Sequence, residues 1–163
     1  MRIGIDLGGT KIEVIALDSM GVVCLRRRVS TPTEGYERTL KKVVDLIKDI
    51  ETELGKVCSV GIGIPGAVSS VTGKIKNANS TCLIGQHFDK DLSIALRREI
   101  RLSNDANCFV LSEAIDGAGS DGKVVFGVII GTGVGAGIAL NGNIWNGPNA
   151  IAGEWGHNPL PWA

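Results

Sequence analysis

Two segments of this chain combine a run of β-branched apolar residues with a cluster of glycines, and they constrain the fold more than any other feature. The first is RIGIDLGGTK at residues 2–11, and the second is VIIGTGVGAG at residues 128–137. In each, a strand-like run ends in glycines and a second strand-like run follows, as in a tight β-hairpin. Glycines at such a turn let backbone N–H groups approach a phosphate, because no Cβ stands in the way.

Two such hairpins about 120 residues apart predict a clamp that closes on one nucleotide from two sides. Asp6 stands where the first strand ends, and its carboxylate is placed to hold a hydrated Mg²⁺ rather than the phosphate itself. The predicted nucleotide-binding residues in the two turns are Gly8, Gly9, Thr10, Lys11, Gly131, Thr132 and Gly133.

The second turn also satisfies the dinucleotide-binding fingerprint G-x-G-x-x-G/A, at residues 131–136. That fingerprint requires a helix directly after the glycines, so that the helix N-terminus can bind the pyrophosphate. Residues 137–142 are instead typical of a strand and a turn, which favours a β-hairpin phosphate loop. A tight turn with a purely structural role is the other alternative.

Composition argues against several classes of protein. Of the 163 residues 44% are hydrophobic, and 17 basic residues balance 17 acidic ones. Equal charge counts argue against a nucleic-acid partner, and no segment approaches the ~18 apolar residues of a membrane span. The four cysteines are isolated from one another, which suits reduced thiols. We therefore expect a soluble cytoplasmic protein that contacts neither nucleic acid nor membrane.

Hydrophobic periodicity predicts strands and helices in alternation. Strands are expected at residues 2–6, 12–17, 22–30, 57–64 and 100–103, and helices at residues 33–55, 91–98 and 106–117. This order predicts α/β layers around a mixed sheet. Residues 69–88 are polar and predict an irregular loop with a short strand at residues 74–76.

The sequence GAGSDG at residues 117–122 is the best candidate for a domain boundary. Strands at residues 124–130 and 135–140 and a hairpin turn at Asn141 and Gly142 follow it. We predict a small α/β domain at residues 1–117 and the start of a second domain at residues 118–163. Two or three strands without a covering helix cannot bury their own faces, so the second domain is expected to be truncated.

Three polar clusters are candidates for substrate chemistry. Asn104 and Asp105 lie between a short strand and a helix, where a carboxylate can take a proton from a hydroxyl, or where either residue can simply cap the helix. Glu154 and His157 are suited to binding vicinal hydroxyls, and His157 also to binding a metal, unless both are ordinary surface residues. The polar loop at residues 77–81 has sugar-like chemistry but is equally typical of turns.

In their order along the chain, these segments resemble the ROK family of bacterial sugar kinases and repressors, within the actin–hexokinase-type ATPase superfamily. The matching segments span essentially the whole chain and are DLGGTK (6–11), GIPG (63–66), NDAN (104–107), GTGVG (131–135) and GEWGHNP (153–159). The resemblance implies an α/β fold of the actin–hexokinase-like (ribonuclease H-like) ATPase type. Residues 76–81, 88–92 and 156–162 look most like the bacterial fructokinase (manno-fructokinase) branch.

The resemblance also implies roles for individual residues. Asp105 matches the base that deprotonates the sugar hydroxyl attacking the γ-phosphate of Mg-ATP, and both glycine turns match phosphate-binding loops. The sugar-binding positions that it implies are Gly66, Asn79, Asn104, Asp105, Glu154 and His157. ATP and Mg²⁺ are thus the expected cofactors and a hexose the expected substrate. A homodimer is expected because family members are commonly dimeric.

The family carries a C-x-C-G-x-x-G-C-x-E segment after the matched histidine, which supplies three zinc thiolates and a further sugar-binding glutamate. This sequence ends at Ala163, before such a segment. His157 is then a single ligand for a site that needs about four, so we expect no stable zinc site in this chain. We also expect weak or absent kinase activity from these 163 residues alone.

The predicted function is that of an ATP-dependent hexokinase, with D-fructose converted to fructose 6-phosphate. The alternatives are an N-acetylglucosamine or glucose kinase of the same family, a non-catalytic sugar-binding fragment and a ROK-type regulator. Against the regulator, no helix-turn-helix pattern precedes the strand that begins at Arg2.

Overall fold

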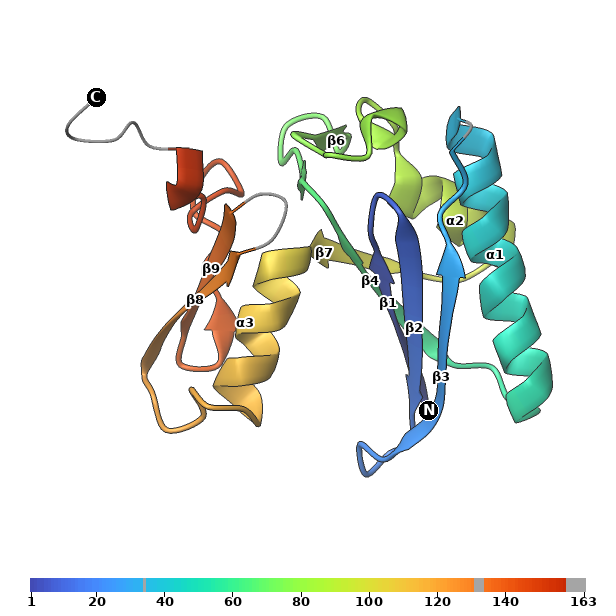
Figure 1. The fold of residues 1–163 in the computed structure, drawn as a ribbon, viewed down its shortest axis with the longest axis horizontal. Coiled ribbons are helices and arrows are strands. Elements are labelled where there is room, and N and C mark those ends of the chain that lie inside the picture. Colours follow the sequence, from blue (N-terminus) through green and yellow to red (C-terminus); the bar gives the residue numbers. More distant parts are fainter. Residues whose placement is uncertain (34, 131–133, 158–163) are drawn as a thin grey trace. The chain divides into compact units, whose positions relative to one another are not determined.

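The computed structural model describes residues 1–33, 35–130 and 134–157 (Figure 1). It consists of two compact units, residues 1–103 and residues 104–163, and each is described by itself. Within these described ranges, no helix is long and apolar enough to cross a membrane.

The first unit contains a five-stranded mixed sheet, which confirms the sheet type expected from the sequence. Its strands are β1 (Arg2–Leu7), β2 (Lys11–Leu17), β3 (Val23–Ser30), β4 (Ser59–Ile64) and β7 (Arg101–Asn104), in the spatial order β3-β2-β1-β4-β7. β1, β2 and β3 form an antiparallel meander, whereas β1 and β4 are parallel. A parallel pair needs a long crossover, and α1 (Gly35–Leu54) supplies it between β3 and β4.

The core of the first unit joins this sheet to α1 and to α2 (Phe88–Leu96). Side chains alternate along β1 and recur every three or four residues along α1, so each element turns one apolar side inward. The buried residues include Ile3, Ile5 and Leu7 on β1, Val43, Ile47 and Ile50 on α1, and Phe88 and Leu92 on α2. Each buried Ile, Leu or Phe stabilises the fold by about 1.5–3 kcal/mol.

Helix α2 begins three residues earlier than the predicted start at Asp91. Phe88 is fully buried and meets the ring of Tyr36 edge-on, with 6.0 Å between the ring centroids. The Tyr36 hydroxyl donates a hydrogen bond to the Asp91 carboxylate. Asp91 therefore accepts a tertiary hydrogen bond inside the helix instead of capping its first turn.

A close backbone contact at Gly66 holds the loop that follows β4. This loop contains β5 (Ala67–Val68), β6 (Ile75–Lys76) and the 3₁₀ helix η1 (Thr81–Leu83). Gly66 has a φ of +104°, and a Cβ there would lie 2.6 Å from the Lys76 carbonyl oxygen and 2.9 Å from the Ala78 nitrogen. The position therefore requires glycine, both for its backbone conformation and for the space.

The second unit is a three-stranded antiparallel sheet with one long helix. Its elements are α3 (Asp105–Ile115), β8 (Val124–Ile130), β9 (Val134–Leu140), β10 (Asn143–Ile144) and the 3₁₀ helix η2 (Trp155–His157), with the strands in the order β10-β9-β8. The predicted hairpin turn is confirmed, because Asn141 and Gly142 connect β9 to β10 with φ values of +49° and +71°. Both central residues of a type I′ turn require positive φ.

Helix α3 covers one face of this sheet, so the second unit is not the uncovered hairpin that the sequence predicted. Val110 and Ala114 on the helix pack with Ala139 on β9. Glycines make room for them, since a Cβ on Gly127 would lie 2.4 Å from Val110 Cγ2 and one on Gly137 would lie 3.1 Å from it. The compact units consequently divide after residue 103 and not at residues 117–122.

Apolar residues remain exposed elsewhere in the second unit. Ile115 is 59% exposed at the end of α3. Val124, Phe126 and Ile130 alternate with the α3-facing residues of β8 and are also exposed. Phe126 meets Trp155 of η2 edge-on, with ring centroids 6.4 Å apart. In the described ranges, we find no α-helix over this face.

Substitution at Gly66 tests the close contact in the first unit. We expect Gly66→Ala to lower the free energy of unfolding of this unit by at least the ~1–3 kcal/mol of a strained backbone. Gly61→Ala on β4 is the matched control, because a Cβ there meets nothing within 4 Å. Hydrogen exchange of peptides from β4 to β6 in increasing urea measures the free energy of unfolding of both variants. Equal destabilisation by the two substitutions would contradict a close contact at Gly66.

Substitution at Gly137 tests the packing of α3 on β9. A Cβ on Gly137 would lie 2.8 Å from Asn107 Oδ1, whereas one on Gly135 would only touch Ala106 Cβ at 3.5 Å. We expect Gly137→Ala to destabilise the second unit by about 1–3 kcal/mol, and Gly135→Ala to leave it unchanged or up to ~1 kcal/mol more stable. The three tryptophans all follow residue 140, so tryptophan fluorescence during urea unfolding reports on this unit.

Candidate active site

Two of the predicted binding segments lie at the same edge of the first sheet. β1 and β4 are parallel, with Asp6 beside Gly63 in register, so both strands end on the same side. The turn at residues 8–10 follows β1, and Gly66 follows β4. Open α/β sheets bind their ligands outside the carboxyl ends of their strands.

Hydrogen bonds and the missing side chain of Gly8 fix the turn at residues 8–10. The Gly8 N–H donates to the Lys11 carbonyl at 3.0 Å, and the Thr31 hydroxyl donates to the Gly8 carbonyl at 2.7 Å. A Cβ on Gly8 would lie 2.9 Å from the Lys11 carbonyl oxygen. Gly9 and Thr10 are exposed, so the backbone of this turn is accessible to an anion.

Asp6 and Lys11 are exposed on the two strands that flank the turn. Asp6 lies between the buried Ile5 and Leu7, so its side chain is on the opposite face of the sheet. An exposed carboxylate at a strand end suits a hydrated Mg²⁺, which usually keeps several of its waters. The side chains at the turn therefore fit the predicted Mg²⁺ and phosphate, and these roles stay predictions.

The polar loop at residues 77–80 lies beside the turn. A Cβ on Gly9 would be 3.8 Å from Ser80 Oγ. Asn79 is exposed, and Asn77 has a left-handed φ of +54°. The structure thus brings the turn, Gly66 and the Asn79 loop to one end of the first unit, while their contacts with sugar and phosphate stay predictions.

In the second unit, the start of α3 shows which of Asn104 and Asp105 caps the helix, a role that the sequence left open for either residue. Asn104 is the helix cap, and its Oδ1 accepts a hydrogen bond of 3.1 Å from the Asn107 N–H. Asp105 Oδ1 accepts one of 2.8 Å from the Ala106 N–H. Burial raises the pKa of Asp105, and the hydrogen bonds that its carboxylate receives from the Ala106 and Asp105 backbone and from the Asn104 side chain oppose this rise. Since Asn104 caps the helix, Asp105 is not needed for that role.

Glu154 follows a glycine that packs closely on β9. A Cβ on Gly153 would lie only 2.1 Å from the Ala136 carbonyl oxygen, and Glu154 itself is half-buried. The first turn of α3 contacts the same stretch of β9, through Ala106 at Gly135 and Gly137. The backbones that carry Asp105 and Glu154 are therefore both positioned by residues 135–137.

Some predicted site residues lie outside the described part of the chain. Gly131, Thr132 and Gly133 are among them, and the side chain of His157 is not described either, although its backbone belongs to η2. Among the described residues, no group of three or more His, Cys, Asp or Glu side chains could hold a metal ion. The expectation about zinc stays a prediction.

Asn107 is a positioning residue that was not predicted from the sequence. It is buried on α3, and its Nδ2 donates to Asn146 Oδ1 at 3.2 Å, which ties the helix to the segment after β10. Its backbone N–H donates the capping hydrogen bond to Asn104 Oδ1. The available signal was the spacing of Asn104 and Asn107, because residues three apart lie on one side of a helix.

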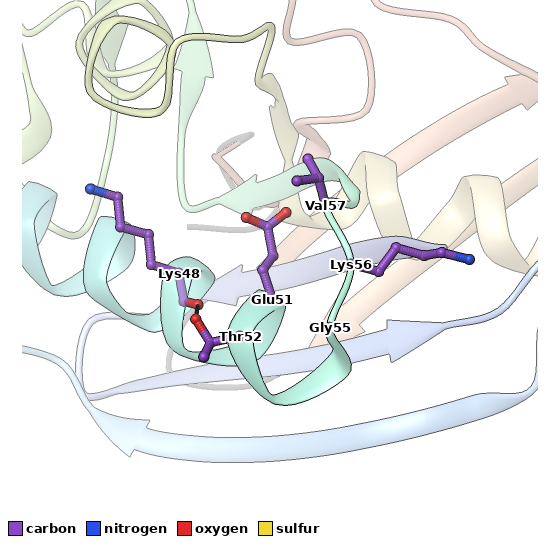
Figure 2. Close-up of a pocket in the computed structure, with 6 residues that line it drawn as sticks. All are labelled: Lys48, Glu51, Thr52, Gly55, Lys56 and Val57. Atoms are coloured by element: carbon purple, nitrogen blue, oxygen red, sulfur yellow. Dashed lines mark hydrogen bonds between the residues drawn. The ribbon is translucent and has the colours of Figure 1, made fainter.

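A separate shallow depression of about 520 Å³ lies at the C-terminal end of α1 (Figure 2). Its lining residues are Lys48, Glu51, Thr52, Gly55, Lys56 and Val57. It is at the edge where Arg2 pairs with Ser59, opposite to the turn at residues 8–10. Glu51 already accepts hydrogen bonds from the Cys58 N–H and from Arg98, both at 2.7 Å. The depression is therefore not part of the predicted site.

Comparison with known sequences identifies the family to which this chain belongs. The sequence profile of the ROK family matches residues 2–162. The N-acetyl-D-glucosamine kinase of Pectobacterium atrosepticum is 44% identical over 99% of this chain and 53% of its own length. That of Yersinia pestis is 45% identical over 99% of this chain and 63% of its own length. The chain thus spans little more than half the length of these curated relatives.

Solved structures agree with this assignment. A ROK hexokinase from Thermus thermophilus matches with a TM-score of 0.83 and 31% identity, over 98% of this chain and 53% of that one. A ROK family glucokinase from Streptomyces griseus, solved with glucose and AMPPNP, matches with a TM-score of 0.85 and 26% identity, over 98% of this chain and 50% of that one. The predicted actin–hexokinase-type α/β fold is confirmed, and the chain belongs to the ROK family.

Proposed function

We propose that this protein phosphorylates a hexose on its 6-hydroxyl, with ATP as the phosphoryl donor. The observation that carries the proposal is the state of Asp105, a carboxylate with raised pKa at the start of α3 whose capping role is taken by Asn104. General bases work best when their pKa is moved towards the working pH. Relatives named as kinases and a related glucokinase solved with AMPPNP support the same reaction.

In the proposed reaction, Asp105 accepts the proton of the 6-hydroxyl while the sugar oxygen forms a bond to the γ-phosphorus. The bond between that phosphorus and the β–γ bridging oxygen breaks, and ADP leaves. The turn at residues 8–10 would bind phosphate through its backbone, and Asp6 would hold a hydrated Mg²⁺, which would supply neutralisation of the phosphate charge. Phosphoryl transfer depends mainly on such positioning and charge neutralisation, so few reactive side chains are needed.

The remaining assignments belong to the same proposal. Gly66, Asn79, Asn104, Glu154 and His157 bind the sugar, and the second turn, residues 131–133, binds nucleotide phosphate. A cytoplasmic location and a homodimer are also proposed, on the grounds given by the sequence. Weak activity of the 163-residue chain remains an expectation, since its relatives are nearly twice as long.

Two hexoses are candidates for the substrate. The curated relatives favour N-acetyl-D-glucosamine, because those described above carry that name at 44–45% identity. D-fructose is favoured by the segments at residues 76–81, 88–92 and 156–162, which look most like the fructokinase branch. The relatives supply the stronger argument, so N-acetyl-D-glucosamine is the first candidate, in place of the fructose expected from the sequence alone.

An ADP-release assay over a panel of hexoses tests the reaction. We expect Asp105→Asn to lower kcat/KM by about 10²–10⁴-fold, the usual contribution of a general base. Asp116→Asn, an exposed acid at the other end of α3, is the matched control and should have little effect. The assay is run on this chain and on a version completed with the second half of the Pectobacterium atrosepticum relative. Absence of turnover from both would refute the kinase assignment.

The stability of Asp105→Asn as a function of pH tests the burial of the carboxylate. The pKa of Asp105 is raised above its ordinary value of 3.8, so between the two values the folded state binds more protons than the unfolded state. Stability then decreases as pH rises through this window. At pH 7 we expect Asp105→Asn to melt above the unsubstituted chain, with the difference shrinking as pH falls below the raised pKa. A variant less stable at pH 7 would contradict the burial argument.

A further inference from the structure

Ser80 has a hydroxyl without a hydrogen-bond partner in the described part of the chain. Its Oγ is inaccessible to solvent and makes no hydrogen bond there. Ser80 also occupies the cap position of η1, where a serine hydroxyl ordinarily accepts a backbone hydrogen bond, and it makes no such bond. Such an unpaired buried hydroxyl destabilises a protein, so its presence here calls for a function.

The hydroxyl faces the turn that follows β1. A Cβ built on Gly9 would lie 3.8 Å from Ser80 Oγ. Asn79, the adjacent residue, is exposed and is the proposed sugar contact. Ser80 therefore stands between a loop assigned to the sugar and a turn assigned to phosphate, and both belong to the first unit.

The loop side of this pair is held in place by the fold. Ala78 is buried, and its backbone is held against Gly66, where a Cβ would meet Ala78 N at 2.9 Å. On the other side of Ser80, Leu83 is fully buried, and its N–H donates to the Ser80 carbonyl at 3.0 Å. The backbone that carries the hydroxyl is thus set before any ligand arrives, and the exposed Gly9, between the hydrogen-bonded Gly8 and Thr10, is the part of the turn that can adjust.

We propose that Ser80 is a positioning residue that links the sugar loop to the phosphate turn. When the turn binds phosphate, the backbone at Gly9 reorients and the Ser80 hydroxyl forms a hydrogen bond with one of its groups. A hydroxyl can donate or accept, so it suits either a carbonyl or an N–H of the turn. The bond makes the binding of hexose and of nucleotide interdependent. This inference rests on the proposed kinase function.

Ser80→Ala in the 163-residue chain tests the link. Calorimetric titration measures the Kd of AMP-PNP with Mg²⁺, with and without saturating N-acetyl-D-glucosamine or D-fructose. We expect the unsubstituted chain to bind nucleotide about 5-fold or more tightly when hexose is present, as for a typical coupling between sites. Ser80→Ala should lose this coupling, and Ser80→Thr, which keeps the hydroxyl, should restore at least part of it. Ser70→Ala, an exposed position in the same loop, is the control and should leave it unchanged.

Thermal unfolding of the unliganded variants separates this role from a structural one. Because the hydroxyl is unpaired without ligand, Ser80→Ala should melt at the same temperature as the unsubstituted chain or higher. A lower melting temperature with intact coupling would show that Ser80 only supports the fold, and would overturn the inference. Binding of both ligands without coupling in the unsubstituted chain would also overturn it. If that chain bound neither hexose nor nucleotide, the proposed function would fail first and the inference with it.

Discussion

The parallel pairing of β1 with β4 determines where the first unit can bind a ligand. In an antiparallel pair, the ends of the two strands would lie at opposite edges of the sheet. Because they run in the same direction, the turn after Leu7 and the loop after Ile64 emerge side by side. The apolar side of α1 stabilises this arrangement, since the helix is the crossover that the parallel pair needs and also covers the core.

Glycine has the corresponding role in the second unit. Gly127 and Gly137 let α3 approach the sheet, and Gly153 lets the segment that carries Glu154 lie on the β9 backbone. The helix start that bears Asp105 is thereby fixed by backbone contacts and by the Asn104 cap. The acid proposed as the base is then not the helix cap, although its burial opposes its own ionisation.

Local patterns could predict the strands but not the partners of the helices. The bounds of β8 were predicted correctly, because its β-branched run is bordered by turn-forming residues on both sides. The sequence pattern put a domain boundary at residues 117–122, whereas the compact units divide after residue 103, because the packing of α3 is set by glycines of β8 and β9 that lie more than ten residues away. The glycine turns of the site could be predicted in the same way, because glycines that border a β-branched run indicate a turn. The unpaired hydroxyl of Ser80 and the burial of Asp105 depend on tertiary contacts, which no local pattern contains.

Backbone contacts such as the one at Gly66 explain why family membership indicates the fold more firmly than it indicates which sugar is the substrate. Gly66 fixes the backbone near Ala78, and this contact depends on main-chain atoms that every sequence possesses. Asn79, by contrast, is exposed on the anchored loop and contributes little to the core. Substitution at such a position can alter which hydroxyls are recognised without a large cost in stability. For the proposed kinase, we therefore expect the choice of hexose to depend on a few exposed side chains on a backbone that the glycines hold constant.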